Sequence, residues 1–379
     1  YSVSEERFIT SKEAEEGDFR EVKKLVEENY FFKMSKYQSK LIEHIEKNPD
    51  FIQPEGRKNE VLGFLKKPLN DLCISRPKSR LQWGIELPFD NNYVTYVWFD
   101  ALLNYITAIG WDENEQSFRK WWPVNYHLIG KDILTTHSVY WPTMLMAIGI
   151  PLPKTIFAHG WWLSDESKMS KSLGNVVNPL DLIDEYGVDP LRYFLMKEMV
   201  LGKDSTFTVD LFIERYNADL ANDYGNLVNR VTILIHKHFN SLIPEPGNFN
   251  EIDLELIGFA KTTPQLVKND IEELKIPDGI EKTIVLMRKI NKYLEVKSPW
   301  KSIKLDSSQK SDAATTMYIS ADLLRICSQL LNPVMPERTI AILKMLGASN
   351  LPINNYSTGL LQSGQNLGEG KSPFPRIII

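Results

Sequence analysis

Apolar and amphipathic segments alternate between residues 93 and 160. Residues 93–99 (YVTYVWF) are all β-branched or aromatic, which is typical of a strand buried on both faces. Apolar runs at 126–130 (YHLIG) and 155–160 (TIFAHG) predict two further strands, with helical spacing from about Asp100 and again from Ile133 to about Ile148. This alternation indicates a parallel α/β sheet, whose active site lies at the carboxyl ends of the strands.

The pattern becomes helical beyond Pro179. Residues 181–186 and 190–199 predict short helices, and helical periods then dominate to about Leu346. Turn sequences at 244–247 (PEPG) and 276–279 (IPDG) divide this region into separate helices, so an all-α bundle follows the α/β part. The tail from 363 to 379 is rich in Gly, Ser and Pro until Phe374, and we expect its end to dock on another domain.

Composition narrows the class of protein. A chain of 379 residues with 43% hydrophobic and 25% charged residues suits two or three globular domains. No apolar run reaches eighteen residues and no signal peptide begins the chain, so we expect no membrane association and a cytoplasmic location. Two distant cysteines exclude a disulfide framework and a Cys-rich zinc site. The net charge of −5 argues against a generic polyanion coat but permits a local basic face.

One loop carries candidate chemistry. Residues 168–175 (KMSKSLGN) follow the third predicted strand. Lys168 and Lys171 flank the small hydroxyl residue Ser170. At the carboxyl end of a strand, such a loop can place ammonium groups on the oxygens of a triphosphate and stabilise charge that shifts between phosphates. Two lysines at this spacing are, by themselves, more often a solvated basic turn.

The full string resembles the second signature of the class I aminoacyl-tRNA synthetases. Four further segments, taken with it, resemble the methionyl-tRNA synthetase family in the family's own order: 96–101 (YVWFDA), 127–133 (HLIGKDI), 158–161 (AHGW) and 222–230 (NDYGNLVNR). The resemblance implies a Rossmann-type catalytic domain that activates methionine with ATP and transfers it to tRNA(Met), including initiator tRNA. It implies Mg²⁺ carried by ATP, no protein metal ligand and a monomer.

Two departures from the family's pattern shape the expected organisation. The first signature, His-Ile-Gly-His, is missing, so we expect the chain to lack the first half of the catalytic domain and to enter within the connective insertion. That insertion is expected to be free of zinc, since Ser4 and Glu6 stand where ligands would be. The expected domains are the insertion with its return to the core (1–88), the second Rossmann half with the lysine loop (89–178), linking helices that contact the tRNA stem (179–208), an anticodon-binding bundle (209–350) and a tail (351–379).

The resemblance assigns site residues. Trp98, Leu102 and Tyr105 lie at helical spacing with Ala101, a stripe that by spacing alone is core. The implied methionine-binding residues are Trp98, Ala101, Leu102, Tyr105, Asp132, Ile133, His137 and Trp141. The implied ATP-binding residues are Gly130, Asp132, His159, Gly160, Lys168, Met169, Ser170 and Lys171. Lys168 and Lys171 are the implied catalytic groups, and Arg76 is expected to support Asp132 as an ionic partner.

An RNA-binding face is expected in the helical part. Asn222, Asn226 and Arg230 are spaced to share one helix face, which alone would be read as a solvated stripe. Residues 281–310 hold eight basic and three acidic residues, a local net of +5 that includes Trp300 as a stacking candidate. The resemblance makes Asn226, Arg230 and Trp300 readers of the CAU anticodon.

Two alternatives remain open from the sequence. Another class I synthetase, for leucine, isoleucine, valine or cysteine, would share the loop. The cysteine enzyme usually needs a zinc thiolate site. The other three carry a large editing insertion, which is not visible between Tyr93 and Lys168. The second alternative is a non-catalytic tRNA-binding fragment of the same enzyme, because half of the nucleotide site is missing.

Overall fold

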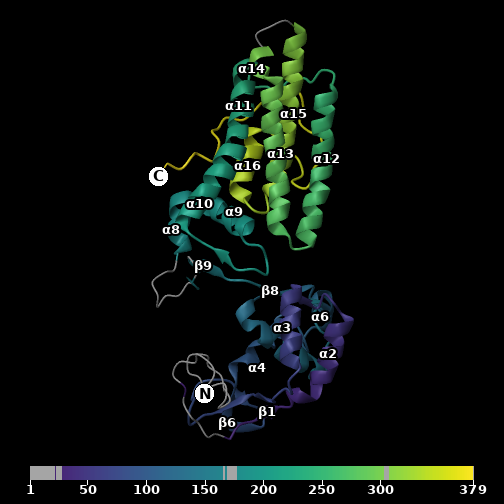
Figure 1. Cartoon of the computed structure of the whole chain (residues 1–379), viewed down its shortest axis with the longest axis vertical. Coiled ribbons are helices and arrows are strands. Elements are labelled where there is room, and N and C mark those ends of the chain that lie inside the picture. The colour runs from purple at the N-terminus through teal and green to yellow at the C-terminus, as the bar shows by residue number, and fades with distance from the viewer. Residues whose placement is uncertain (1–21, 23–27, 165–166, 169–176, 303–306, 379) are drawn as a thin grey trace. The chain divides into compact units, whose positions relative to one another are not determined.

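The computed structural model describes residues 22, 28–164, 167–168, 177–302 and 307–378. The chain divides into two compact units, Tyr1–Ala158 and His159–Ile379 (Figure 1). Each unit has its own buried apolar clusters, so each is described by itself.

The first unit is built on a small sheet with the strand order β2-β8-β7. These strands are β2 (Ile52–Gln53), β8 (Thr155–His159) and β7 (Tyr126–Gly130), and β2 runs parallel to β8 with Ile52 opposite Ile156. The predicted strands at 126–130 and 155–160 are therefore confirmed, whereas the two-residue β2 was too short to predict. Ile52 and Ile156 are fully buried against α2 (Gln38–Lys47) and α3 (Glu55–Leu65), which contribute Ile45 and Leu65.

The predicted strand at 93–99 is only partly correct. The strand β6 (Asp90–Thr95) ends three residues before Trp98. It lies in a separate antiparallel sheet with the order β4-β6-β5, where β4 is Ser75–Pro77 and β5 is Glu86–Leu87. It is not buried on both faces. The chain enters helix α4 (Val97–Ala101) because helical phasing packs Trp98 and Leu102 into an apolar cluster, and this tertiary packing overrides strand propensity.

The remaining elements of the first unit surround these sheets. Strands β1 (Phe31–Phe32) and β3 (Leu72–Cys73) pair antiparallel. The other helical segments described in this unit are η1 (Met34–Tyr37), α5 (Asn104–Thr107), α6 (Glu115–Trp121), the 3₁₀ turn η2 (Lys131–Ile133), the π-helix η3 (Thr136–Tyr140) and α7 (Trp141–Ile148). The predicted helix from Ile133 to Ile148 is thus present, with a π-helical turn that its sequence period did not indicate.

The second unit begins with a short sheet and continues as helices. Its strands have the order β10-β9-β11: β9 (Trp162–Ser164), β10 (Ser167–Lys168) and β11 (Ser205–Thr206). Its described helices are α8 (Pro179–Tyr186), α9 (Val188–Glu198), α10 (Val209–Arg215), the π-helix η5 (Tyr216–Gly225), α11 (Asn226–His238), α12 (Glu251–Glu272), α13 (Ile276–Lys297), α14 (Pro299–Ser302), α15 (Ser307–Leu331) and α16 (Pro336–Met345).

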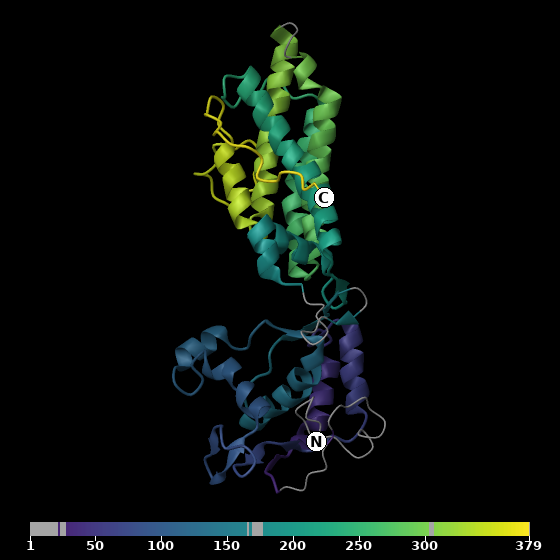
Figure 2. The same ribbon diagram turned by 90° about the vertical axis from the view of Figure 1, so that its left-hand side faces the viewer.

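The long helices α11, α12, α13 and α15 run side by side (Figures 1 and 2). Apolar residues at helical spacing, among them Leu227, Val231, Ile284 and Met287, are fully buried in one core. The predicted break at 244–247 is confirmed, since these residues separate α11 from α12. The second break lies at 273–275, just before the predicted turn, because residues 276–279 form the first turn of α13.

The tail lies against this helical core. Phe374 is buried and its ring centroid is 5.0 Å from that of Tyr224. The Asn217 amide and the Ile377 backbone exchange two hydrogen bonds of 2.9 Å. The tail is therefore part of the second unit's packing, while the bounds of the five domains expected from the sequence remain predictions.

Candidate functional site

Six rings from α4, α5, β7, η3, α7 and the residue after α6 form what we call the ring cluster: Trp98, Tyr105, Trp122, His127, His137 and Trp141. Tyr105 is at its centre, with ring centroids 4.4 Å from His127, 5.7 Å from His137 and 6.1 Å from Trp141. Trp98 lies edge-on to His137 at 6.2 Å. Four of the eight residues predicted to bind methionine are thus brought together, and all six side chains are uncharged or can be neutral.

Hydrogen bonds fix the proton positions in the cluster. His137 Nδ1 is 3.0 Å from the carbonyl oxygen of Ile133, which can only accept, so Nδ1 carries a proton. In the neutral ring Nε2 is then an acceptor, and the Tyr105 hydroxyl donates to it at 3.0 Å. Trp141 Nε1 donates to His127 Nε2 at 3.3 Å.

Burial keeps these groups neutral. Burial, with a smaller contribution from His137, lowers the pKa of His127 to about 4. Burial also lowers the pKa of His137, against the opposing hydrogen bond to Ile133, and raises that of Tyr105. At neutral pH the cluster therefore presents polarizable rings without a formal charge.

The other predicted methionine-binding residues surround the cluster. Leu102 is buried, Ile133 is half-buried, and Ala101 and Asp132 are exposed. Arg76 is buried on β4, donates to the carbonyl of Ser75 at 2.8 Å, and stacks its guanidinium 4.6 Å from the ring centre of Tyr96. Its expected ion pair with Asp132 remains a prediction.

The predicted nucleotide-binding residues fall at strand ends. Gly130 ends β7, and His159 ends β8 with Nδ1 2.7 Å from the carbonyl oxygen of Gly160, to which it donates. A Cβ at Gly160 would lie 2.1 Å from the backbone oxygen of Lys203, so glycine is required there by the approach of the chain itself. Lys168 lies in β10, and Met169, Ser170 and Lys171 lie outside the described residues.

The predicted anticodon residues are accessible in the second unit. Asn226 is exposed at the start of α11, Trp300 is half-buried in α14, and Arg230 forms a 3.4 Å ion pair with Glu295. The two side chains of this pair are 40% and 53% exposed, so the pair contributes little, about 0–1 kcal/mol, and leaves Arg230 free to exchange partners.

The basic segment 281–310 is less positive in space than along the chain. Arg288 and Lys297 are held by Asp223 and Asp253, at 2.6 Å and 3.3 Å, and Lys282 pairs with an aspartate of α12. These acids lie outside the segment, so a count along the sequence could not include them. The expected excess of +5 at this face is therefore an overestimate, with exposed Lys292 remaining on α13.

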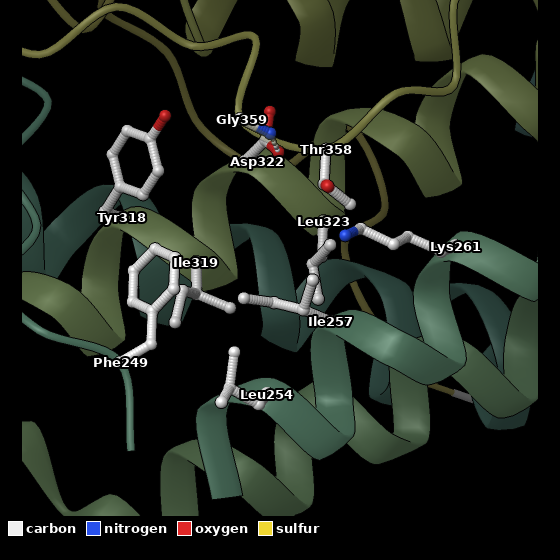
Figure 3. Close-up of a pocket in the computed structure, with 10 residues that line it drawn as sticks. All are labelled: Phe249, Leu254, Ile257, Lys261, Tyr318, Ile319, Asp322, Leu323, Thr358 and Gly359. Carbon is white, nitrogen blue, oxygen red and sulfur yellow. Dashed lines mark hydrogen bonds between the residues drawn. The ribbon is translucent and has the colours of Figure 1, made fainter. Parts of the chain in front are cut away.

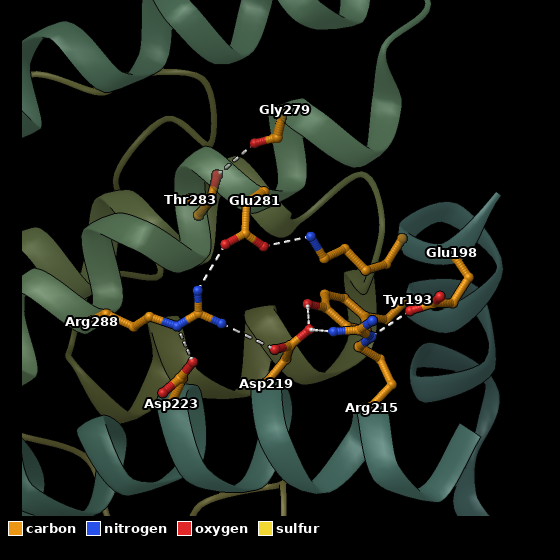
Figure 4. Close-up of polar contacts among 10 residues, drawn as sticks. Tyr193, Glu198, Arg215, Asp219, Asp223, Gly279, Glu281, Thr283 and Arg288 are labelled. Atoms are coloured by element: carbon orange, nitrogen blue, oxygen red, sulfur yellow. Dashed lines mark hydrogen bonds and ion pairs between the residues drawn. The ribbon is translucent and has the colours of Figure 1, made fainter. Parts of the chain in front are cut away.

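A network of charged side chains crosses α9, α10, η5 and α13 (Figure 4). We call it the ionic seam; its residues are Tyr193, Lys197, Glu198, Arg215, Asp219, Asp223, Glu281 and Arg288. Buried Asp219 accepts from the Tyr193 hydroxyl at 2.8 Å and from Arg288 at 3.3 Å. Burial raises the pKa of Tyr193 well above its usual value, and the neighbouring Asp219 adds to this. Its contacts are satisfied within the unit, which indicates a structural role.

Cavities are present in both units. One of about 200 Å³ lies between α12, α15 and the tail, with an apolar floor and the Lys261 side chain at its edge (Figure 3). The other, of about 360 Å³, adjoins the ring cluster and shares Tyr105, Trp122 and His127 with it. The predicted anticodon residues do not line either cavity.

The described residues carry neither a membrane span nor a metal-binding cluster. No described helix is both long and apolar enough to span a membrane. The described residues also contain no group of three or more His, Cys, Asp or Glu side chains placed to hold a metal ion. Ser4 and Glu6 lie outside the described residues, so the expectation of a zinc-free insertion remains a prediction.

Sequence reasoning missed His127 as a site residue. The resemblance assigned His137 and Trp141, which lie four residues apart in the sequence, whereas His127 lies on a strand and joins them only in the fold. Residues 126–130 (YHLIG) do not alternate between polar and apolar types, so the sequence carried no signal that His127 faces the buried side.

Comparisons with known proteins agree with this arrangement. The family described as "tRNA synthetases class I (M)" matches residues 4–232, and the "Anticodon binding domain of methionyl tRNA ligase" matches residues 243–372. Methionine--tRNA ligase of Clostridium tetani is 46% identical over 94% of this chain and 56% of its own length. Methionine--tRNA ligase 1 of Bacillus anthracis is 41% identical over 100% of this chain and 60% of its own length.

A solved structure of Mycobacterium tuberculosis methionyl-tRNA synthetase in complex with methionyl-adenylate is also similar. Its TM-score is 0.93 at 38% identity, with 99% of this chain and 76% of that chain covered. A Rossmann-like sheet followed by a helical anticodon-binding domain places the chain among the class I tRNA synthetases. Within that class, the chain belongs to the methionyl (M) family. It spans a little over half the length of the curated relatives it matches.

Proposed function

We propose that this chain serves methionyl-tRNA synthesis: activation of methionine by ATP, followed by transfer of the methionyl group to tRNA(Met), initiator tRNA included. The observation that carries the proposal is the ring cluster, in which Tyr105, His137 and Trp98 form a neutral aromatic surface. Aromatic rings bind a thioether well, because sulfur is polarizable and makes favourable contacts with ring edges. The curated relatives named above carry the same activity in their names.

The first step is an attack of the methionine carboxylate on the α-phosphate of ATP. A new oxygen–phosphorus bond forms, the bond between the α- and β-phosphates breaks, and pyrophosphate leaves with the Mg²⁺ carried by ATP. Lys168 and Lys171 stabilise the charge that develops on the phosphate oxygens, and Met169 and Ser170 bind ATP beside them. In the second step a ribose hydroxyl at the tRNA 3′ end takes the acyl group and AMP leaves.

The amino acid is held by groups on both sides of β7. The rings of Trp98, Tyr105 and Trp141, with Ala101, Leu102, Ile133 and His137, receive the side chain. The exposed carboxylate of Asp132 fixes polar groups of the amino acid and adenosine, with Arg76 as its supporting partner. Gly130, His159 and Gly160 border the nucleotide.

The helical unit supplies recognition of the anticodon. Asn226 and Arg230 offer bidentate donors to exposed base edges, and Trp300 offers a ring for stacking. A stacked base contributes about 1–3 kcal/mol. The weak, exposed pair between Arg230 and Glu295 supports this role, because Arg230 loses little when it turns to RNA.

The lysine loop provides the test. In the complete protein that carries this sequence, Lys171→Ala should slow methionine-dependent ATP–pyrophosphate exchange by about 10²–10³-fold while methionine binding stays intact. Lys237→Ala, at an exposed position on α11, is the matched control and should exchange as the unaltered protein does. Unchanged exchange in Lys171→Ala would overturn this role.

A second function is favoured by the self-contained core of the helical unit. Such a unit can bind tRNA without charging it. Filter binding of initiator tRNA by this chain, run beside an ATP-driven charging assay, separates the two functions, since binding without charging supports the second. We further propose a monomer in the cytoplasm, which light scattering and fractionation would test.

A further inference from the structure

We propose that His127 is a positioning residue of the methionine pocket: as a neutral hydrogen-bond acceptor it holds the Trp141 indole in place. This inference rests on the proposed function, because it gives His127 a part in the same site. The family resemblance assigned the pocket to the residues around His127 and left His127 without a role.

The position of His127 is fixed by contacts from three sides. Its side chain is only 6% exposed, on the buried side of β7. The ring packs 4.4 Å from Tyr105, 6.0 Å from Trp122 and 6.3 Å from His137, measured between centroids. A residue so enclosed transmits any change in its own position to Tyr105.

The bond to Trp141 defines the protonation state of His127. An indole N–H can only donate, so His127 Nε2 must be unprotonated to accept it at 3.3 Å. The neutral ring therefore carries its proton on Nδ1. In an imidazolium, the Nε2 proton of His127 would face the indole proton of Trp141, and no hydrogen bond could form. The neutral state that this bond requires agrees with the His127 pKa of about 4 that burial produces.

The consequence for the pocket is that three of its donors are already engaged. The Tyr105 hydroxyl gives its proton to His137, His137 gives its Nδ1 proton to Ile133, and Trp141 gives its proton to His127. None of these three protons remains for a side chain bound beside them. The Trp141–His127 bond therefore fixes the position of a buried ring that packs 6.1 Å from Tyr105, measured between ring centroids.

Two substitutions separate the acceptor from the ring. His127→Phe keeps a ring against Tyr105 but removes the acceptor, leaving the buried Trp141 N–H without a partner. His127→Gln loses the ring, yet its amide oxygen reaches nearly the position of Nε2 and restores the acceptor. Trp141→Phe removes the donor, so the double variant with His127→Phe closes a thermodynamic cycle.

The experiment measures methionine-dependent ATP–pyrophosphate exchange in the complete protein that carries this sequence. His127→Phe should raise the KM for methionine about tenfold and change the KM for ATP less than about twofold. His127→Gln should recover most of the loss. In the Trp141→Phe background, adding His127→Phe should change the methionine KM by less than about twofold, since the bond is already absent.

Each other result counts against one of the two proposals. An unchanged methionine KM in His127→Phe, no recovery in His127→Gln, or a full tenfold effect in the Trp141→Phe background would overturn the role of His127. If the melting curve shows that His127→Phe does not fold, the test uses His127→Gln alone. A methionine KM within about threefold of that of the unaltered protein then supports the role of His127, and a larger rise overturns it. No exchange in the unaltered protein would overturn the proposed function itself, and this inference with it.

Discussion

The ring cluster and the ionic seam satisfy buried polar groups in opposite ways. In the first unit, Tyr105, His127 and His137 are all neutral, and each donor meets a neutral acceptor. In the second unit, Asp219 receives a tyrosine hydroxyl and two arginines, and Arg288 meets three carboxylates. The first region can therefore accept an apolar ligand, whereas the charged groups of the second are already paired with one another.

The difference shows how a site is distinguished from a support. A neutral cluster with a half-open ring such as Tyr105, 40% exposed, still has surface to offer. The ionic seam ties α9 to α13 through Lys197 and Glu281 at 2.5 Å, and α10 to α9 through Arg215 and Glu198. Charged groups that are matched in this way hold helices together and leave no partner unsatisfied for a ligand.

Removing the central carboxylate of the seam should have the largest effect. Asp219→Ala leaves Tyr193 buried without its acceptor and removes a partner from Arg215 and Arg288, so we expect a loss of about 3–5 kcal/mol in the unfolding free energy. Urea unfolding followed by circular dichroism measures it. Glu214→Ala, at an exposed position on the neighbouring turn, should change less than about 0.5 kcal/mol. Equal losses in both variants would contradict the seam's role.

Acid should affect the cluster through His127. Its folded pKa of about 4 is below the value of 6.5 expected when unfolded, so the stability that it contributes is present above pH 6.5 and is lost as the pH falls towards 4. Between pH 7.5 and 4.5 the unaltered protein should lose about 2–3 kcal/mol relative to His127→Gln, which cannot titrate there. His137 and Tyr105 are the titratable neighbours, and both are present in each protein. Parallel pH profiles of the two proteins would contradict the neutral state of His127.

A smaller effect is expected from the Tyr105 hydroxyl. Tyr105→Phe leaves His137 Nε2 without its donor while the ring remains, which should cost about 1 kcal/mol in thermal or urea unfolding. The matched control is Tyr126→Phe, whose ring lies half-exposed on the same unit. If the two losses are the same, the hydrogen bond to His137 contributes nothing.

The exposed ion pair should matter least. Glu295→Gln removes the partner of Arg230, yet the pair is solvated, so the unfolding free energy should change by less than about 0.5 kcal/mol. Unfolding in low and high salt measures this change. A larger, salt-sensitive loss of unfolding free energy would show that the pair stabilises the fold as the ionic seam does and is not simply part of the accessible surface.

Much of the local structure could be predicted from the sequence, because it depends on neighbours along the chain. The helices near 133–148 and 181–199 follow from apolar spacing. The stripe that contains Trp98, Leu102 and Tyr105 is instead divided between α4 and α5, and its members Ala101 and Tyr105 are exposed. The strand predicted at 93–99 is only partly correct because the packing of Trp98, and not strand propensity, decides the conformation of its second half.

Contacts between distant residues could not be predicted in the same way. The seam joins Asp219 to Arg288, which are 69 residues apart, so a charge count over 281–310 missed the acid that neutralises the arginine. The role of His127 depends on a bond to Trp141 across a strand and a π-helical turn. Neither the pairing nor the π turn has a signature in the local pattern.

The most direct test of the account is a comparison of amino acids in ATP–pyrophosphate exchange by the complete protein that carries this sequence. If the neutral ring cluster selects a thioether, methionine should support exchange with a kcat/KM at least about tenfold above those of leucine, isoleucine, valine and cysteine. Equal or faster exchange with any of these four, or none with methionine, would contradict the assignment of the ring cluster as a methionine pocket.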